Sequence, residues 1–411
     1  MVYRGTNKIL TLILPSALIL LFISDGINKF FQIRSAQLNA DGDMFADSFS
    51  ASIFVRFTYQ LIFIFLIYWF YDKERGKGVM LLFGIICLFL LGQFTFLLTY
   101  RDANYSLGHH LTLFNKYLYV FIIFYAIKDI VYDKTLLKKL ASILEYLFVF
   151  NSILIFIGLV FKVDLFKSYF SQDLRFGYNG LIPSVNEATL FYMVGISLLY
   201  FRYIKEGKCF WSLWICIIST LPMGAKAMYL FLLLLLMYHI VIRANLIQKV
   251  VSIIVIVGGV IAILPTLLSA KYSFLFDFFI YQYEKYGLLF MITSGRSTIF
   301  MLRFAENLNF WSWINYFIGG TDQYKYYIEM DFFDSFLFLG ILGTILLLIL
   351  YFNTIFKNIK FKSFRFFFCF AFFSIAFMVG HFFSSALNAL YLNIALIYIY
   401  SYEQQIEEAA V

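Results

Sequence analysis

Residues 329–351 read EMDFFDSFLFLGILGTILLLILY, an acidic start that runs directly into an apolar helix. The stretch before it, 270–329, mixes aromatic and polar residues and is long enough to form a small cap outside the membrane. It contains Ser294-Gly295-Arg296, then Arg303, then Gly319-Gly320. Because almost all the rest of the chain is apolar, we expect any chemistry where this loop meets the helix.

The composition is that of a membrane protein. The chain has 411 residues, of which 62% are hydrophobic and 14% charged, whereas soluble proteins carry about 25% charged residues. A helix needs roughly 20 apolar residues to cross a bilayer, and such runs recur along the whole length. The sequence therefore predicts one polytopic, all-α membrane domain over 1–411.

We predict about twelve transmembrane helices, at 8–24, 53–71, 78–100, 110–131, 138–161, 184–203, 209–223, 226–243, 248–268, 331–353, 363–381 and 384–402. Short connectors rich in Lys and Arg then fall on one side with both termini, at 71–77, 128–139, 202–208, 243–249 and 357–365. Short basic loops stay in the cytoplasm. The longer loops, 25–52, 100–109, 162–183 and 270–329, therefore face outward, and so does the function.

The remaining composition excludes several kinds of site. The net charge of +8 is explained by the basic connectors, so we expect no nucleic-acid partner. The four cysteines lie in apolar runs without CxxC spacing, and no His, Cys or Asp spacing suits a closed metal site. We expect neither a metal nor a cofactor.

Ionisable residues collect near the outward helix ends. Charges near a bilayer are costly, so they are functional candidates by default. Guanidinium groups grip phosphate oxygens in pairs, and a neighbouring carboxylate or His can take a proton from an attacking hydroxyl. A lipid diphosphate would suit such a set, with its polyprenyl tail held by Phe-rich helices. The candidates are Arg175, Glu187, Lys226, Arg296, Arg303, Glu329, Asp331, Asp334 and His381.

Each candidate also has a purely structural interpretation. Arg175 would be a solvated loop residue, and Lys226 would extend to a lipid headgroup. Arg303 would pair on a helix surface with Glu306. The two aspartates would be favoured at a helix start by the helix dipole, and a lone histidine at a helix end is more often structural.

Four short segments follow one another along the chain, and the predicted topology puts all four on the outward side of the membrane. Arg175-Phe176-Gly177 leads to Pro183-Ser184-Val185-Asn186-Glu187-Ala188, and Pro222-Met223-Gly224-Ala225-Lys226-Ala227 lies between two spans. Ser294-Gly295-Arg296 precedes Phe317-Ile318-Gly319-Gly320, and residues 329–334 precede Gly340-Ile341-Leu342-Gly343. Over 170–345 the chain thus resembles the Wzy O-antigen polymerase and O-antigen ligase superfamily of bacterial inner-membrane proteins.

The resemblance implies a GT-C-like membrane fold with one large periplasmic loop, 270–330, and a second at 162–183. It implies a metal-independent glycosyltransferase that joins undecaprenyl-diphosphate-linked oligosaccharide repeat units in O-antigen or capsule synthesis. Expected partners are these lipid-linked oligosaccharides, membrane lipids, a chain-length regulator and a flippase. The expected location is the inner membrane, with both termini cytoplasmic.

The resemblance also suggests roles for the candidates. Arg175, Lys226, Arg296 and Arg303 would bind diphosphate and sugar, together with Asp334, and Glu187 would orient an arginine. Asp331 or Glu329 is the first choice for the base and His381 the second.

Two alternatives remain open. A ligase would pass polymer to the lipid A core, but such ligases usually have a His-Asn-like motif where this chain has residues 329–334. A non-enzymatic flippase should have a charged cavity deep in the membrane. Here the ionisable residues crowd one end, and Glu145 is the only acidic residue placed well within a span.

Overall fold

The computed structural model of the protein is all-α. It describes residues 2–38, 51–70, 72–102, 105–169, 176–242, 245, 247, 249, 277–357, 359 and 362–410. Within these ranges no strand forms, and the single isolated β-bridge joins Lys167 to Tyr178. Six of the described helices are long and apolar enough to cross a membrane. The all-α fold is confirmed, and these helices support a membrane-embedded protein.

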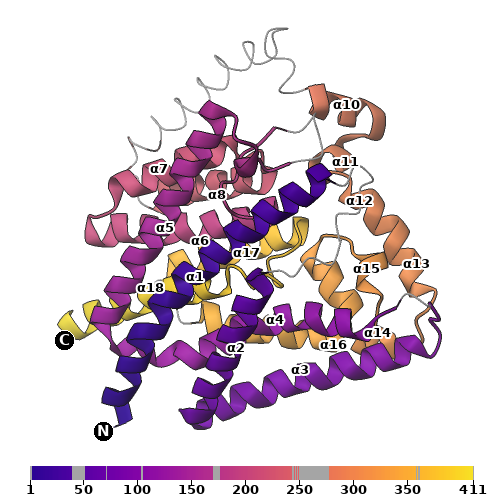
Figure 1. The fold of residues 1–411 in the computed structure, drawn as a ribbon, viewed down its shortest axis with the longest axis horizontal. Coiled ribbons are helices and arrows are strands. Elements are labelled where there is room, and N and C mark those ends of the chain that lie inside the picture. The colour runs from indigo at the N-terminus through magenta and orange to yellow at the C-terminus, as the bar shows by residue number, and fades with distance from the viewer. Residues whose placement is uncertain are drawn as a thin grey trace.

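Long helices alternate with short connections (Figure 1). The longer helices are α1 (Val2–Leu38), α2 (Ala51–Trp69), α3 (Lys73–Leu97), α4 (Leu107–Ile127), α5 (Lys134–Phe161), α6 (Val185–Glu206), α7 (Phe210–Thr220), α8 (Lys226–Ile242), α16 (Asp331–Tyr351), α17 (Lys362–Met378) and α18 (Ala389–Ala410). A helix overlaps every predicted span that the structure describes, whereas 248–268 lies outside the described residues. The bounds of the last two spans, 363–381 and 384–402, are wrong, because α17 ends at Met378 and α18 begins only at Ala389. The number of spans, about twelve, stays a prediction.

The segment before α16 is a run of short helices and not a plain loop. These are α10 (Asp277–Tyr286), α11 (Leu288–Thr293), α12 (Arg296–Ile299), α13 (Ala305–Leu308), α14 (Asn315–Ile318) and α15 (Gln323–Tyr326), with a π-helical turn at Phe300–Phe304. The α14 helix packs on both α3 and α16. This part of the predicted large loop is thus packed onto the helical bundle.

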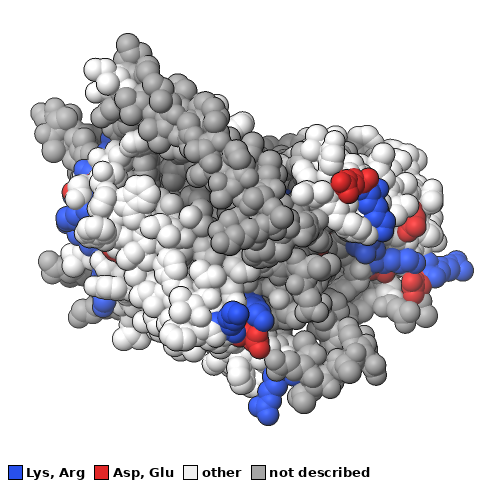
Figure 2. Space-filling model, turned by 90° about the horizontal axis from the view of Figure 1, so that it is seen from above, with Lys and Arg blue, Asp and Glu red and all other residues white. Residues whose placement is uncertain are grey.

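Charged side chains are sparse on the molecular surface. In the view of Figure 2 they gather in a few groups, with other residues between them. Large apolar side chains are exposed on the long helices, for example Phe54 and Phe57 on α2 and Phe83 on α3. Such a surface would be unstable in water and suits contact with lipid tails.

Connections that the sequence predicts on one side of the membrane contact each other. Arg75 and Asp129 pair at 2.7 Å, which joins the 71–77 and 128–139 connectors. At the other end, the Tyr100 hydroxyl donates to Asp322 at 2.9 Å. The backbone N–H of Gln323 donates to His110 Nε2 at 3.0 Å. This hydrogen bond holds the start of α15 against the start of α4.

Helix α16 is interrupted at Gly340, where φ is 64° and ψ is −173°. A Cβ on Gly340 would lie 2.4 Å from the backbone N of Gly319, and one on Gly92 of α3 would lie 2.3 Å from the carbonyl oxygen of Ile318. The N–H of Gly320 donates to Leu337 O at 3.0 Å. We call Gly92, Gly319, Gly320 and Gly340 the glycine junction. Here three backbones meet at a distance that only glycine permits.

Gly340→Ala should destabilise the protein by about 2 kcal/mol or more, because it combines a left-handed backbone with a steric clash. Thermal unfolding of the detergent-solubilised protein measures this effect. Gly84→Ala is the matched control, since its Cβ would meet only Leu346 at an ordinary 3.6 Å. Equal melting temperatures for the two variants would contradict the claim that position 340 requires glycine.

Candidate functional site

The carboxylate of Asp331, in the first turn of α16, anchors a separate part of the chain. It accepts hydrogen bonds from the backbone N–H groups of His381 at 2.8 Å, Phe382 at 2.6 Å and Phe383 at 3.1 Å. These residues belong to the connection 379–388 between α17 and α18, which we call the His381 turn. Asp331 itself is fully buried, so it serves as the internal support of this turn.

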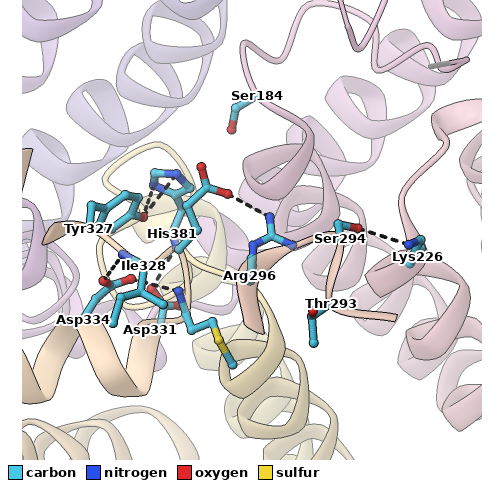
Figure 3. Close-up of polar contacts among 12 residues, drawn as sticks. Ser184, Lys226, Thr293, Ser294, Arg296, Tyr327, Ile328, Asp331, Asp334 and His381 are labelled. Carbon is cyan, nitrogen blue, oxygen red and sulfur yellow. Dashed lines mark hydrogen bonds and ion pairs between the residues drawn. The ribbon is translucent and has the colours of Figure 1, made fainter. Parts of the chain in front are cut away.

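Asp334 has a corresponding function one helical turn later. Its carboxylate accepts the N–H of Ile328 at 2.8 Å and that of Met330 at 2.9 Å. The chain just before α16, 327–330, therefore folds back over the helix, and we call it the Glu329 turn. Figure 3 shows both aspartates beneath Tyr327 and His381.

The two turns pack against each other, and each contains a strained residue. Glu329 has φ of 64° and His381 has φ of 76°, a left-handed conformation that is uncommon outside glycine. A Cβ on Gly380 would lie 2.8 Å from the Tyr327 hydroxyl. That hydroxyl lies 3.3 Å from both ring nitrogens of His381. Backbone strain of this kind clusters at functional sites.

His381 is held as a neutral imidazole. Burial lowers its pKa to about 4, and the positive charges of Lys116 and Arg296 act in the same direction, against an opposing effect of Glu329. Charging a buried imidazole costs solvation energy that these neighbours do not offset. At neutral pH the ring therefore offers one donor and one acceptor.

The predicted cations have different surroundings. Arg296 Nη2 pairs with Glu329 Oε2 at 3.0 Å, but its Nε is buried and has no hydrogen-bond partner among the described residues. Lys226 donates to the Met291 carbonyl and, at 3.2 Å, to Ser294, and Arg303 donates to the Tyr327 carbonyl. Lys226 thus supports the backbone next to Arg296, and Arg303 supports the Glu329 turn. In Figure 3, Arg296 lies between Lys226 and His381.

A second group of charges lies within the helices. Arg56 on α2 pairs with Asp25 on α1, and Ser52 donates to the same carboxylate at 2.5 Å. Arg56 Nε is buried without a partner in the described chain. Lys116 on α4 interacts electrostatically with Arg56 and with Glu187. Both cations could have been found from the sequence, since Arg56 and Lys116 each lie inside a predicted span, where a charge is costly.

Glu187 connects this second group to the His381 turn. It lies in the first turn of α6, where its N–H donates to Ser184 Oγ at 3.2 Å. Its carbonyl accepts Asn388 Nδ2 at 3.0 Å, and Asn388 belongs to the His381 turn. We call Arg56, Lys116, Glu187, Arg296, Glu329 and His381 the charged site.

The structure thus brings most of the predicted residues together. Six of them lie in or next to the two turns: Arg296, Arg303, Glu329, Asp331, Asp334 and His381. Lys226 binds Met291 and Ser294, close to Arg296 in the chain. Glu187, on α6, contacts the His381 turn through its carbonyl. Arg175 lies outside the described residues. Within the described chain no group of three or more His, Cys, Asp or Glu side chains is arranged to hold a metal ion.

No protein-family model matches the chain, and no curated protein or solved structure is similar to it.

The charged site combines three kinds of group. Its arginines have N–H donors that the described chain does not use, and His381 is a neutral imidazole. Of its two carboxylates, that of Glu329 pairs with Arg296 and that of Glu187 has no partner in the described chain. Buried N–H groups without partners cost free energy, so an anion that accepted hydrogen bonds from them would bind favourably. Guanidinium groups match phosphate oxygens well. The arrangement can therefore hold an anionic group beside a proton-accepting carboxylate.

Asp331→Asn should lower the free energy of unfolding by about 2–4 kcal/mol. The amide has a single acceptor oxygen for three backbone donors, and hydrogen bonds to a charged group are each worth about 1.5–3 kcal/mol. Thermal unfolding in detergent tests this, with Glu329→Gln as a partly exposed control that should change little. An Asp331→Asn variant as stable as the wild type would return Asp331 to the list of candidate bases.

His381 should make stability depend on pH. Its folded pKa of about 4 lies below the ordinary 6.5, so the unfolded chain binds the proton more readily between these values. The stabilisation is complete above pH 6.5 and is lost as pH falls towards 4. The melting temperature should therefore drop less over this window in His381→Gln than in the wild type. Parallel pH profiles for the two proteins would refute the assignment.

Proposed function

We propose that the protein is a Wzy-type polymerase that joins lipid-diphosphate-linked oligosaccharide repeat units. The supporting observation is the set of three cations in the charged site. Within the described residues, Arg56 Nε and Arg296 Nε are buried without partners, and Lys116 has no hydrogen bond or ion pair. Three cations on α2, α4 and α12 thus have donors that the described chain does not use, which favours an anionic ligand.

A diphosphate fits these donors by its chemistry. Its oxygens spread negative charge over several acceptors, which several separate N–H groups can bind together. When the bond to the sugar breaks, this charge increases, so fixed cations stabilise the transition state more than the ground state. No nucleotide or metal is needed in this scheme, because the lipid diphosphate is itself the activated donor.

The position of the charged site suits a lipid-linked substrate. Asp331 opens α16, one of the helices of membrane-spanning length, and Arg56 and Lys116 lie in two others. A polyprenyl tail could remain among the exposed apolar side chains while the diphosphate reached the cations. The neutral His381 and the Tyr327 hydroxyl would then offer hydrogen bonds to sugar hydroxyls.

A flippase for the same lipid-linked sugars is the second candidate. Lys29 is buried in α1, where it donates to Asn179 Oδ1 at 2.5 Å and to the Gly180 carbonyl at 2.6 Å. Asp25 and Lys29 both lie buried within α1, which continues to Leu38, so the predicted start of the outward loop 25–52 is wrong. Together with the Asp25–Arg56 pair, Lys29 is a charge buried among the helices. Such groups also occur along transport pathways.

Deleting the gene in its polysaccharide-producing strain tests the two candidates. Loss of a polymerase should leave a single repeat unit on the lipid A core, with the ladder gone from a gel of surface polysaccharide. Complementation with Arg296→Ala, at equal membrane abundance, should restore at most about 1% of the polymer, because losing one stabilising donor costs about 10²–10³ in rate. Glu306→Ala, an exposed change on α13, should restore the ladder fully.

The alternatives give other patterns on the same gel. Full-length polymer that stays on its carrier lipid would identify a ligase. A complete absence of repeat units from the outer face would identify a flippase, and either result would overturn the polymerase.

A further inference from the structure

The acidic side chains of the site differ in how much of their hydrogen-bonding capacity is already used. Asp331 accepts three backbone N–H groups and Asp334 accepts two. A carboxylate that holds the backbone in this way cannot also take a proton from a substrate without releasing that backbone, so these two aspartates are poor candidates for a base. Asp25 accepts hydrogen bonds from the side chains of Ser52 and Arg56 through Oδ1, while its Oδ2 has no partner in the described chain. Asp25 is fully buried between helices, so a substrate hydroxyl reaches it poorly.

Two glutamates remain, and one of them is paired. Glu329 Oε2 accepts from Arg296 at 3.0 Å. The carboxylate of Glu187, in contrast, has no hydrogen bond or ion pair within 4 Å to any residue of the described chain. Glu187 is also partly exposed, so a ligand can reach it.

The backbone of Glu187 is nevertheless firmly placed. Ser184 caps the first turn of α6, and Asn388 holds the Glu187 carbonyl. The Asn388 amide is itself oriented by a hydrogen bond to Ser385 Oγ at 2.9 Å. A fixed backbone with a free side-chain terminus is what a group that acts on a substrate requires.

The charges around Glu187 support the same role. Arg56 and Lys116 both interact with it electrostatically, and so does the like charge of Asp25. Two cations that can bind an anionic group are thus close enough to Glu187 to interact with its carboxylate. Lys116 also acts electrostatically on His381, so this one cation interacts with both Glu187 and the His381 turn.

His381 is a weaker candidate for the base. Burial lowers its pKa to about 4, so its protonated form would be strongly disfavoured at neutral pH. It is better suited to hydrogen bonding with a sugar hydroxyl than to accepting a proton in the reaction.

We propose that Glu187 is the general base of the glycosyl transfer; this inference rests on the proposed function. The hydroxyl of the acceptor sugar gives its proton to a Glu187 carboxylate oxygen while the hydroxyl oxygen forms a bond to the anomeric carbon of the donor. The bond from that carbon to the diphosphate oxygen breaks, and its electron pair leaves with the lipid diphosphate. Arg296 and Lys116 offset the new negative charge. The proton on Glu187 then passes to water.

The test uses the full-length protein, purified in detergent, with a lipid-diphosphate-linked repeat unit as both donor and acceptor. Joined repeat units are counted by mass spectrometry at saturating substrate. Glu187→Gln keeps the size of the side chain but cannot accept the proton, so the rate should fall by about 10²–10⁴. Substrate affinity should change by less than about threefold. Glu306→Gln on α13 is the matched control and should keep the wild-type rate.

The pH profile separates a base from a structural residue. The wild-type rate should fall at acid pH as a carboxylate takes up its proton, and the residual rate of Glu187→Gln should not show this fall. A structural role would instead lower the melting temperature and the substrate affinity. If Glu187→Gln does not fold, Glu187→Asp replaces it. The aspartate should retain the acid limb at a rate reduced by about tenfold or more, and a wild-type rate would overturn the proposal.

The possible results separate the role of Glu187 from the polymerase activity itself. An active wild type whose Glu187→Gln variant keeps its rate would overturn Glu187 as the base and leave the polymerase intact. A wild type that binds the lipid-linked unit but joins nothing would overturn the polymerase, and the inference with it.

Discussion

The arrangement of the site depends on one buried carboxylate. Asp331 is at the first position of α16, yet its oxygens bind the backbone of a connection fifty residues later in the chain. A carboxylate in a low-dielectric interior is stable only when donors surround it, and here the His381 turn supplies three. The same bonds fix a histidine in a left-handed conformation beside the Glu329 turn. The buried charge of Asp331 thus stabilises the strained conformation of His381, and the N–H groups of that turn in return stabilise the buried charge.

Around this anchor the polar groups divide into two classes. Asp334 and Arg303 bind backbone atoms of the Glu329 turn, and Lys226 binds the Met291 carbonyl close to Arg296. The cations of the charged site keep donors that the described chain does not use, which is costly in a low-dielectric environment. Proteins tolerate such a cost where a ligand supplies the missing partner. This contrast is the basis on which we propose an anionic substrate, and it rests on hydrogen bonding and not on sequence similarity.

The sequence predicted the helices well, because apolar runs of membrane length determine them almost alone. It also located the acidic start of α16 and the cations near it. It did not reveal that Asp331 binds backbone N–H groups fifty residues away or that Asp334 binds those of the preceding turn, since periodicity contains no information on such partners. Lys116 was missed for a different reason. The candidates were the ionisable residues near helix ends, whereas Lys116 lies inside the predicted span 110–131. The break at Gly340 depends on how closely the α14 backbone approaches, which composition does not encode.

That break has a mechanical consequence. A continuous helix transmits tilt along its whole length, whereas α16 consists of two rods joined at Gly340. The glycine junction holds the outer rod, which bears Asp331 and Asp334, against α3 and the end of α14. The second half, from Ile341 to Tyr351, therefore takes its direction from its own packing, in which Leu346 lies against Gly84 of α3. The direction of the segment that bears Asp331 and Asp334 is thereby set by the glycine junction and not by the rest of α16.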